Sequence, residues 1–442
     1  MQDTLLYILG VLIIAIGIAL SIALHEVGHL LPAKLFRVKV TEFMIGFGPK
    51  IFSRKRGETE YGVRLLPFGG FVRMIGMYPP KAAGEAARDG GTGFLNSVTQ
   101  DAREASAETI GDGEDYRTFY RLATWKKITV MLGGPLVNLL LGVLLYAVLL
   151  TGIGVTGQST TIGSVSECLV AADSEQTECD AAATSAPAAA AGLLPGDRIL
   201  SVDGEKITTW EQFRDTVSNN AETELSVTVA RGEDQLQLRL TPAANSRYVT
   251  DEMGRVVKDS SGKAQIETVG MIGATAATEL QTQPITEVPR YVGENIKQVT
   301  GVILNLPQRL IDVWNAAFGA EERDPNGPIS VVGVGRIAGE IATLDTVPVI
   351  AKVQSMVALL AGLNIALFVF NLIPLMPLDG GHIAGALYEK VKRSLAKLLG
   401  RADPGPIDTA RMVPVTLLVV AVLGAMSLLL IYADLVKPVT LG

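Results

Sequence analysis

Residues 5–31 read LLYILGVLIIAIGIALSIALHEVGHLL, an apolar run in which the acidic and imidazole side chains, Glu26, His25 and His29, all lie near the end. About 20 helical residues are enough to cross the apolar core of a bilayer, so this run is long enough to span one. Ionisable side chains inside a membrane helix are costly and usually serve a function. The run therefore predicts a membrane helix that carries a functional site near its C-terminal end.

Three further apolar runs of similar character occupy residues 128–153, 353–375 and 413–432. The composition agrees with membrane segments, because 48% of the 442 residues are hydrophobic and only 19% are charged. The net charge of −7 and the lack of a basic stripe argue against nucleic acid as a partner. We therefore expect a polytopic α-helical protein of the plasma membrane, with four transmembrane helices in contact with membrane lipid.

The distribution of lysine and arginine predicts how these helices are oriented. Basic residues gather after the first run, before the second, and between the third and fourth. Positively charged loops stay on the cytoplasmic side of a membrane, so these three stretches are predicted to be cytoplasmic. The long acid-rich segment 154–350 is then extracytoplasmic, and the first and third helices point their C-terminal ends toward the cytoplasm.

The segments between the helices differ in composition. Residues 40–78 alternate short apolar runs with glycine, which predicts a membrane-associated β-hairpin region. Residues 81–115 are rich in Ala, Gly, Glu and Asp without an apolar period, which predicts a flexible cytoplasmic insert. Residues 158–243 combine turn signals, alternating strands and one short helix, and predict a small extracytoplasmic α+β domain. Residues 287–318 read as an amphipathic helix on the outer membrane face.

These patterns divide the chain into four predicted parts. They are an N-terminal membrane half (1–157), the extracytoplasmic domain (158–243), a linker with the amphipathic helix (244–350) and a C-terminal membrane half (351–442).

The chain has only two cysteines, Cys168 and Cys179, and both lie in the predicted extracytoplasmic part, where a disulfide can persist. Such a bond would close a short loop and stabilise the fold by about 3 kcal/mol. Two unrelated thiols are the alternative.

His25 and His29 form the motif HExxH together with Glu26. Positions i and i+4 share one face of a helix, so both imidazoles can reach a single metal ion. Glu26 lies beside them and is placed to accept a proton from water at the metal. A chance match is the alternative, but two of the three histidines in the chain stand at ligand spacing. The motif therefore predicts a metal centre.

A catalytic zinc ion needs a third protein ligand and one open position. Asp379 is the candidate, within the stretch NLIPLMPLDGGH at residues 371–382. This stretch ends the third apolar run as HExxH ends the first, so both motifs are predicted at the same depth. A helix cap is the alternative role for Asp379. His382, the last histidine, is interpreted as a supporting hydrogen-bonding group, with a place among the ligands as its alternative.

Together these motifs resemble the site-2 protease family of intramembrane zinc metalloproteases. The likeness is carried by HExxH in the first membrane helix paired with NxxPxxPLDGGH in a later one. Shorter stretches are also similar to that family, at Gly46–Pro49, Phe68–Gly76, Gly134–Asn138 and Gly327–Ser330. The domain at 158–243 resembles a PDZ domain, as in bacterial members that cleave membrane-anchored anti-sigma factors. This chain shows one such module rather than two in tandem.

The resemblance implies an endopeptidase that cuts single-pass membrane substrates, such as anti-sigma factors, after a first protease has trimmed their outer part. His25, His29 and Asp379 would bind Zn²⁺, and Glu26 would be the general base. Asn371 would hold the substrate backbone or the developing oxyanion, with a structural cap as the alternative.

The substrate helix must unwind, because its own hydrogen bonds hide its peptide bonds. An exposed strand edge in residues 40–75 would capture the extended chain by strand addition. Gly46 and Gly48 would allow that close approach, or else they only shape a turn.

Two other classes of function fit parts of the sequence. A membrane PDZ receptor with a structural metal site would explain the ligands, but such a site needs no base at Glu26. A metal transporter would need more ligands inside the membrane helices, and only Asp434 offers one.

Overall fold

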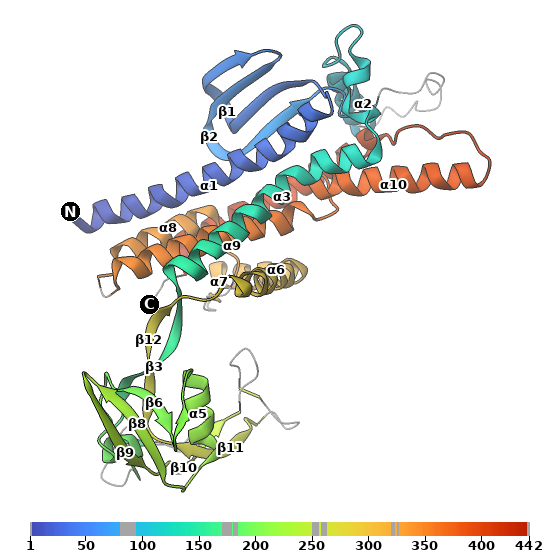
Figure 1. Cartoon of the computed structure of the whole chain (residues 1–442). Helices are drawn as coiled ribbons and strands as arrows, with labels where there is room; N and C mark the ends of the chain where they lie inside the picture. Colours follow the sequence, from blue (N-terminus) through green and yellow to red (C-terminus); the bar gives the residue numbers. More distant parts are fainter. Residues whose placement is uncertain are drawn as a thin grey trace. The chain divides into compact units, whose positions relative to one another are not determined.

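The computed structural model describes residues 2–79, 94–169, 179, 184–249, 256–257, 263–319, 323–324, 327–345 and 347–439. The chain separates into two compact units, and each is described here by itself. The helical unit comprises Met1–Ile153 and Gln283–Gly442, and the β-rich unit comprises Gly154–Thr282 (Figure 1).

Four helices of the helical unit are long and apolar enough to cross a membrane, which confirms the four predicted spans. They are α1 (Gln2–Leu35), α3 (Thr124–Val148) with the π-helical turn η4 (Leu149–Ile153), α9 (Val349–Asn371) and α11 (Val413–Val436). Many of their large apolar side chains are exposed, and only 6% of the most apolar 18-residue stretch of the last span is buried within the protein. Exposed apolar helix surfaces of this kind are typical of helices that contact lipid.

Helix α3 lies at the centre of the helical unit. It packs against α1, α9 and α10 (Asp379–Leu398), while α8 (Val331–Thr343) packs against α1 (Figure 1). The crossing of α1 and α3 is close, because a Cβ on Gly133 would lie 2.0 Å from the carbonyl oxygen of Gly28. Small residues permit such backbone contacts between membrane helices.

The predicted hairpin is formed by β1 (Val40–Arg56) and β2 (Thr59–Met74), an antiparallel pair with repeated register shifts. Gly46 and Gly48 stand within these irregularities with φ values of +89° and +85°. A Cβ on Gly46 would lie 2.6 Å from the carbonyl oxygen of Leu66. The backbone conformation of β1 therefore already requires glycine at these positions, which favours a shaping role for them.

The predicted flexible insert, 81–115, contains a helix where the structure describes it. Helix α2 (Phe94–Ala107) packs on α11 and on the turn η6 (Thr409–Met412). Its Arg103 forms an ion pair with Asp408, and its Ser106 accepts the backbone N–H of Tyr78 at 3.1 Å. Polar tertiary contacts therefore join this helix to the chain after β2 and to η6, within a segment that was predicted as a flexible insert. The rest of the insert up to residue 93 lies outside the described residues.

The predicted amphipathic helix is two helices. They are α6 (Val288–Leu304) and α7 (Leu306–Phe318), with a break at Asn305, just before Pro307. Proline cannot donate the hydrogen bond that would continue α6. The first helix packs against α3 and α9, and the second packs against α11.

The β-rich unit is built around a sheet of strand order β12-β3-β6-β8-β9, with β7 paired to β6. Its strands are β3 (Val155–Val165), β6 (Arg198–Val202), β7 (Glu205–Lys206), β8 (Leu225–Arg231), β9 (Asp234–Leu240) and β12 (Ala274–Gln281). Helix α5 (Trp210–Asn219) covers the core, and Thr209 caps it by accepting the N–H of Gln212. The core includes Ile199, Phe213 and Val227.

This unit is longer than the predicted domain of residues 158–243. Strand β12 forms one edge of the sheet, where it pairs with β3. Strand β10 (Ala243–Tyr248) pairs with β11 (Ile266–Met271). The segment that was predicted as linker therefore supplies strands.

A disulfide joins Cys168 and Cys179, whose Cα atoms lie 5.9 Å apart.

Candidate metal centre

The two histidines of HExxH lie one turn apart on α1 and face α3. Their rings are buried, and Nε2 of His25 lies 3.2 Å from Nε2 of His29. Their spacing of four residues places both nitrogens on the same side of the helix.

Asp379, the first residue of α10, brings a carboxylate to the same point. Its Oδ2 lies 3.4 Å from Nε2 of His25 and 3.4 Å from Nε2 of His29. Helix α9 ends at Asn371, so the chain between the two helices is irregular and carries Asp379 back to α1. The backbone is tight here, since a Cβ on Gly380 would lie 2.3 Å from the carbonyl oxygen of Ile373.

The donor set fits a zinc ion. Tetrahedral ligands about 2.0–2.1 Å from zinc lie about 3.4 Å from one another. The three candidate ligand atoms are separated by 3.2–3.4 Å. Asp379 Oδ2 is buried without a hydrogen-bond partner among the described residues. A buried carboxylate oxygen without a donor is costly unless a cation compensates it, so the arrangement suits a metal.

Both imidazoles are held through their other ring nitrogen. Nδ1 of His29 donates to the carbonyl oxygen of Val130 at 2.8 Å, which leaves Nε2 free to coordinate. The side-chain amide of Asn138 lies 3.0 Å from Nδ1 of His25, and its oxygen has no other partner within the described structure. End-over-end rotation of this amide lets the oxygen accept the Nδ1–H of His25. Such partners orient metal ligands and raise their basicity.

Glu26 is buried and lies beneath strand β2 of the hairpin. A Cβ placed on Gly70 would lie 2.7 Å from Cγ of Glu26 and 3.2 Å from its Oε1. Only a residue without a side chain lets the strand pass this close to the carboxylate. The hairpin and the candidate base are therefore in direct contact.

The structure places the remaining predicted residues outside the cluster of three ligands. Asn371 is the last residue of α9, and His382 follows Asp379 on α10 without joining the ligand group. Gly46 and Gly48 shape β1, as described above.

Three residues of this centre were not assigned a role from the sequence. Gly134 was noted only as part of a similar stretch, yet a Cβ on it would lie 2.3 Å from Nε2 of His29. Asn138 belongs to the same stretch, and an amide inside an apolar helix is a signal of function that could have identified it. No sequence signal ties Gly70 to Glu26, since that contact depends on how the hairpin packs.

Comparison with known proteins finds a peptidase family and several metalloproteases that are similar to this chain. Residues 13–401 match the peptidase family M50. The zinc metalloprotease Rip1 of Mycobacterium tuberculosis is 29% identical over 446 residues, covering 99% of this chain and 100% of the relative. The regulator of sigma-W protease RasP of Bacillus subtilis is 27% identical, covering 83% and 87%. The metalloprotease MmpA of Caulobacter vibrioides is 25% identical, covering 85% of each chain.

Proposed function

Because the chain belongs to peptidase family M50, we propose that His25, His29 and Asp379 hold its catalytic zinc ion and that Glu26 is the general base. The chain is a multi-pass membrane protein and an intramembrane zinc metalloprotease. The observation that carries the assignment is the separation of 3.2–3.4 Å among the three ligand atoms, next to the buried Glu26.

Each residue then has a distinct task. A zinc ion held at this site supplies Lewis acidity, which makes water a nucleophile at neutral pH. Glu26 accepts the proton of the attacking water at a carboxylate oxygen and passes it to the leaving amine. Val130 and Asn138 keep the two imidazoles turned toward the ion through their outer nitrogens.

Asn371 is proposed to donate its amide N–H to the substrate backbone or to the oxyanion that develops on the cleaved carbonyl. Its place at the end of α9, where the chain turns irregular before Asp379, supports this role. Donors aimed at a developing oxyanion can change kcat by about 10²–10³-fold.

The hairpin is proposed to present the substrate in an extended form. Residues 42–45 of β1 pair on one side with 60–63 of β2 and on the other side with 70–73 of β2. Within the described structure the unpaired edges that can accept a further strand therefore belong to residues 50–56 of β1 and 70–74 of β2. Strand β2 passes directly over Glu26 at Gly70. A substrate segment paired along the hairpin would therefore lie near the base. Gly46 and Gly48 contribute by shaping β1.

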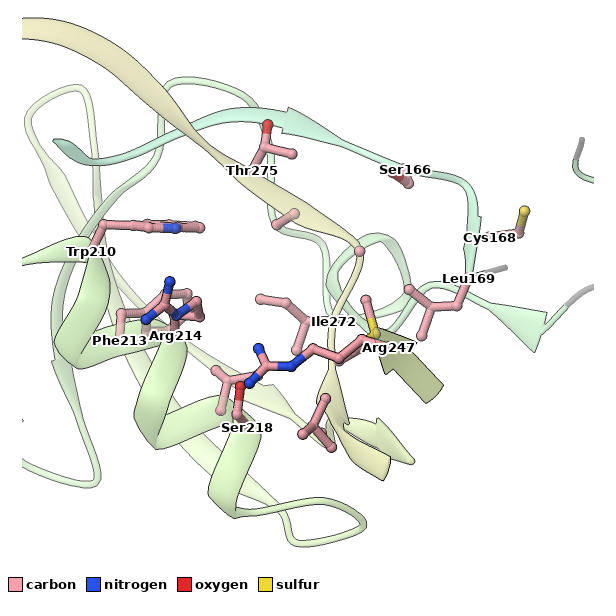
Figure 2. Close-up of a pocket in the computed structure, with 16 residues that line it drawn as sticks. Ser166, Cys168, Leu169, Trp210, Phe213, Arg214, Ser218, Arg247, Ile272 and Thr275 are labelled. Carbon is pink, nitrogen blue, oxygen red and sulfur yellow. The ribbon is translucent and has the colours of Figure 1, made fainter. Parts of the chain in front are cut away.

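The β-rich unit is proposed to be a PDZ-like module that binds substrate. A groove of about 450 Å³ lies between α5 and the segment around β11 and β12 (Figure 2). Trp210 and Phe213 of α5 and Ile272 give it apolar walls (Figure 2). Arg214 and Arg247 also line it, and no acidic residue is among its lining residues in the described structure. We expect it to take an extended peptide with apolar side chains and a carboxylate.

We expect the β-rich unit to prefer peptides with a free C-terminal carboxylate. Fluorescence anisotropy with apolar peptides that end in a free carboxylate should show tighter binding than with the same peptides amidated. Equal binding of both forms would remove the carboxylate from this proposal.

In the membrane, the metal centre is proposed to lie toward the cytoplasm and the β-rich unit outside, and the distribution of lysine and arginine supports this orientation. The substrates proposed are single-pass membrane proteins, with anti-sigma factors as the first candidates, since one relative bears the name regulator of sigma-W protease. Cleavage would follow an earlier cut that removes most of the outer part of the substrate.

The decisive experiment separates metal binding from catalysis in the full-length protein. Glu26→Gln should keep one zinc ion per chain and lose cleavage of a tagged single-pass substrate by at least about 100-fold. His25→Ala should lose both. Normal cleavage by Glu26→Gln would rule out the proposed base, and zinc bound without any base-dependent cleavage would favour the receptor with a structural metal. Comparing membrane-protein fragments from cells with wild type and with Glu26→Gln would identify substrates.

A further inference from the structure

A buried charge pair lies outside the metal centre, between Lys127 of α3 and Glu389 of α10. Nζ of Lys127 donates to Oε2 of Glu389 at 2.9 Å, and the two side chains are only 6% and 5% exposed. Oε2 of Glu389 also accepts the backbone N–H of Ile407 at 3.4 Å, and its Oε1 lies 3.4 Å from the guanidinium of the partly exposed Arg393 on the same helix. The carboxylate therefore joins three segments, which are α3, α10 and the chain just before η6.

Lys127 belongs to the same face of α3 that supports the metal centre. Val130 and Asn138 contact the outer nitrogens of the two imidazoles, and Gly134 lies against both rings. These positions follow Lys127 at spacings of three and four residues, so they share its side of the helix. One stripe of α3 thus contacts the histidines of α1 and, at its N-terminal end, binds α10.

Glu389 stands on the helix that begins with Asp379. An α-helix is rigid along its axis. The contact that holds Glu389 against α3 therefore also fixes where the first turn of α10 lies. His382 lies between these two residues in the sequence and lines the same small cavity of about 30 Å³ as Lys127 and Glu389. The pair and the first turn of α10 are therefore parts of one packed region.

Stability alone does not account for such a pair. Desolvation of two charges often costs as much as their attraction returns, and well-packed apolar residues can replace a buried pair without loss. In some proteins a buried polar or charged pair is retained because it fixes the register of the two elements that carry it.

We propose that Lys127 and Glu389 are positioning residues for the zinc centre, which set α10 along α3 so that Asp379 meets His25 and His29. This inference rests on the proposed role of Asp379 as a zinc ligand. The backbone contact of Ile407 and the neighbouring ion pair of Asp408 with Arg103 of α2 hold the same junction from the other side.

The helical unit contains a matched control. Arg323 and Asp434 form an ion pair at 2.6 Å whose side chains are 4% and 2% exposed. Asp434 also accepts a backbone N–H, that of Ser330, at 2.6 Å. This control pair ties α11 to the segment before α8 and has no contact with α10 in the described structure, so its loss disturbs the fold without touching the metal centre.

The test compares the full-length variants Lys127→Met/Glu389→Leu and Arg323→Met/Asp434→Leu, with thermal unfolding to establish that each is folded. The zinc dissociation constant is measured by competition with a chelator, and the visible spectrum of the Co²⁺-loaded protein reports the geometry of the ligands. We expect the first variant to bind zinc about 10–100-fold more weakly and to change the Co²⁺ spectrum. The control variant should keep the wild-type values of both.

Wild-type zinc affinity and spectrum in folded Lys127→Met/Glu389→Leu would overturn the inference. If that variant does not fold, Glu389→Gln, which keeps the shape of the side chain, serves in its place under the same criterion. Asp379→Ala tests the proposed zinc ligand separately from the positioning role. Unchanged zinc affinity in Asp379→Ala would refute the proposed ligand itself, whereas its loss together with an unaffected pair variant would refute only the positioning role.

Discussion

Gly134 of α3 lies directly against the imidazole of His29 on α1. A Cβ on Gly134 would stand 2.3 Å from Nε2 of His29 and 2.7 Å from Nε2 of His25. These are the two nitrogens that face Asp379. The close crossing of the two helices and the metal centre are therefore a single feature, and one methyl group at this position would disturb both.

Replacement of Gly134 by alanine should abolish zinc binding. The new Cβ would occupy space beside the Nε2 atoms of His25 and His29, so the rings would have to turn away. Zinc content per chain, measured on purified protein, should fall from about one to background, and cleavage should be lost with it. Gly142→Ala is the control on the same helix, because there a Cβ meets the flexible side chain of Ile365. A full complement of tightly bound zinc in Gly134→Ala would contradict the geometry.

Replacement of Asn138 by leucine should weaken zinc binding without unfolding the protein. The amide is the only partner that the described structure gives Nδ1 of His25. Loss of such a partner typically weakens metal binding by about 10–100-fold, or about 1.4–2.7 kcal/mol. Asn364→Leu is the matched control, since Asn364 is equally buried but donates to Ser21. Chelator competition that ranks the two variants equally would remove Asn138 from the centre.

Replacement of Gly70 by alanine should separate catalysis from metal binding. The added Cβ would press on Cγ of Glu26 at 2.7 Å and displace its carboxylate, while the three ligands stay in place. We expect normal zinc content with kcat reduced by about tenfold or more, since a positioned general base contributes about 10²–10⁴-fold. Gly62→Ala crowds the carbonyl oxygen of Phe52 within the same hairpin and controls for general damage to it. An equal loss of kcat in both variants would mean that the contact with Glu26 is not the cause.

The four membrane helices could be predicted because each is a long apolar run that stands out from its surroundings. The position of His25 and His29 on one face of α1 could be predicted from helical spacing alone. The approach of Asp379 to them was predicted from matching depth in the membrane, and the structure places the three ligand atoms together.

Other features depend on packing that no local pattern encodes. The contacts of Gly134 and Asn138 could be predicted only if it were known which face of α3 meets α1. Helix α2 contacts its neighbours through Arg103 and Ser106, whereas the composition of residues 81–115, rich in Ala, Gly, Glu and Asp, predicted a flexible segment. Strand β12 lies far from β3 in the sequence, and its pairing extends the β-rich unit beyond the predicted boundary.

The buried Asp197 anchors the β-rich unit through an ion pair with the partly exposed Arg231. Its side chain is 1% exposed, and Arg231 donates to both carboxylate oxygens at 2.7 Å. The N–H of Leu194 donates to Oδ2 at 2.9 Å. The hydrogen bonds from Arg231, supported by that backbone donor, hold the pKa of Asp197 below its ordinary value of 3.8.

Acid should therefore destabilise the β-rich unit through this residue. A carboxyl whose pKa is lower in the folded state contributes its full stability above its unfolded pKa, near pH 3.8, and loses it as the pH falls through the folded pKa. Hydrogen exchange of the β6 and β8 amides in the full-length protein should quicken as the pH falls below about 4, beyond the intrinsic change of exchange rate. Asp197→Asn should show weaker protection at neutral pH and a smaller further loss in acid. Asp215→Asn, which removes only an exposed pair with Arg214, should follow the wild type. An acid response of Asp197→Asn as large as that of the wild type would place the sensitivity in other carboxylates.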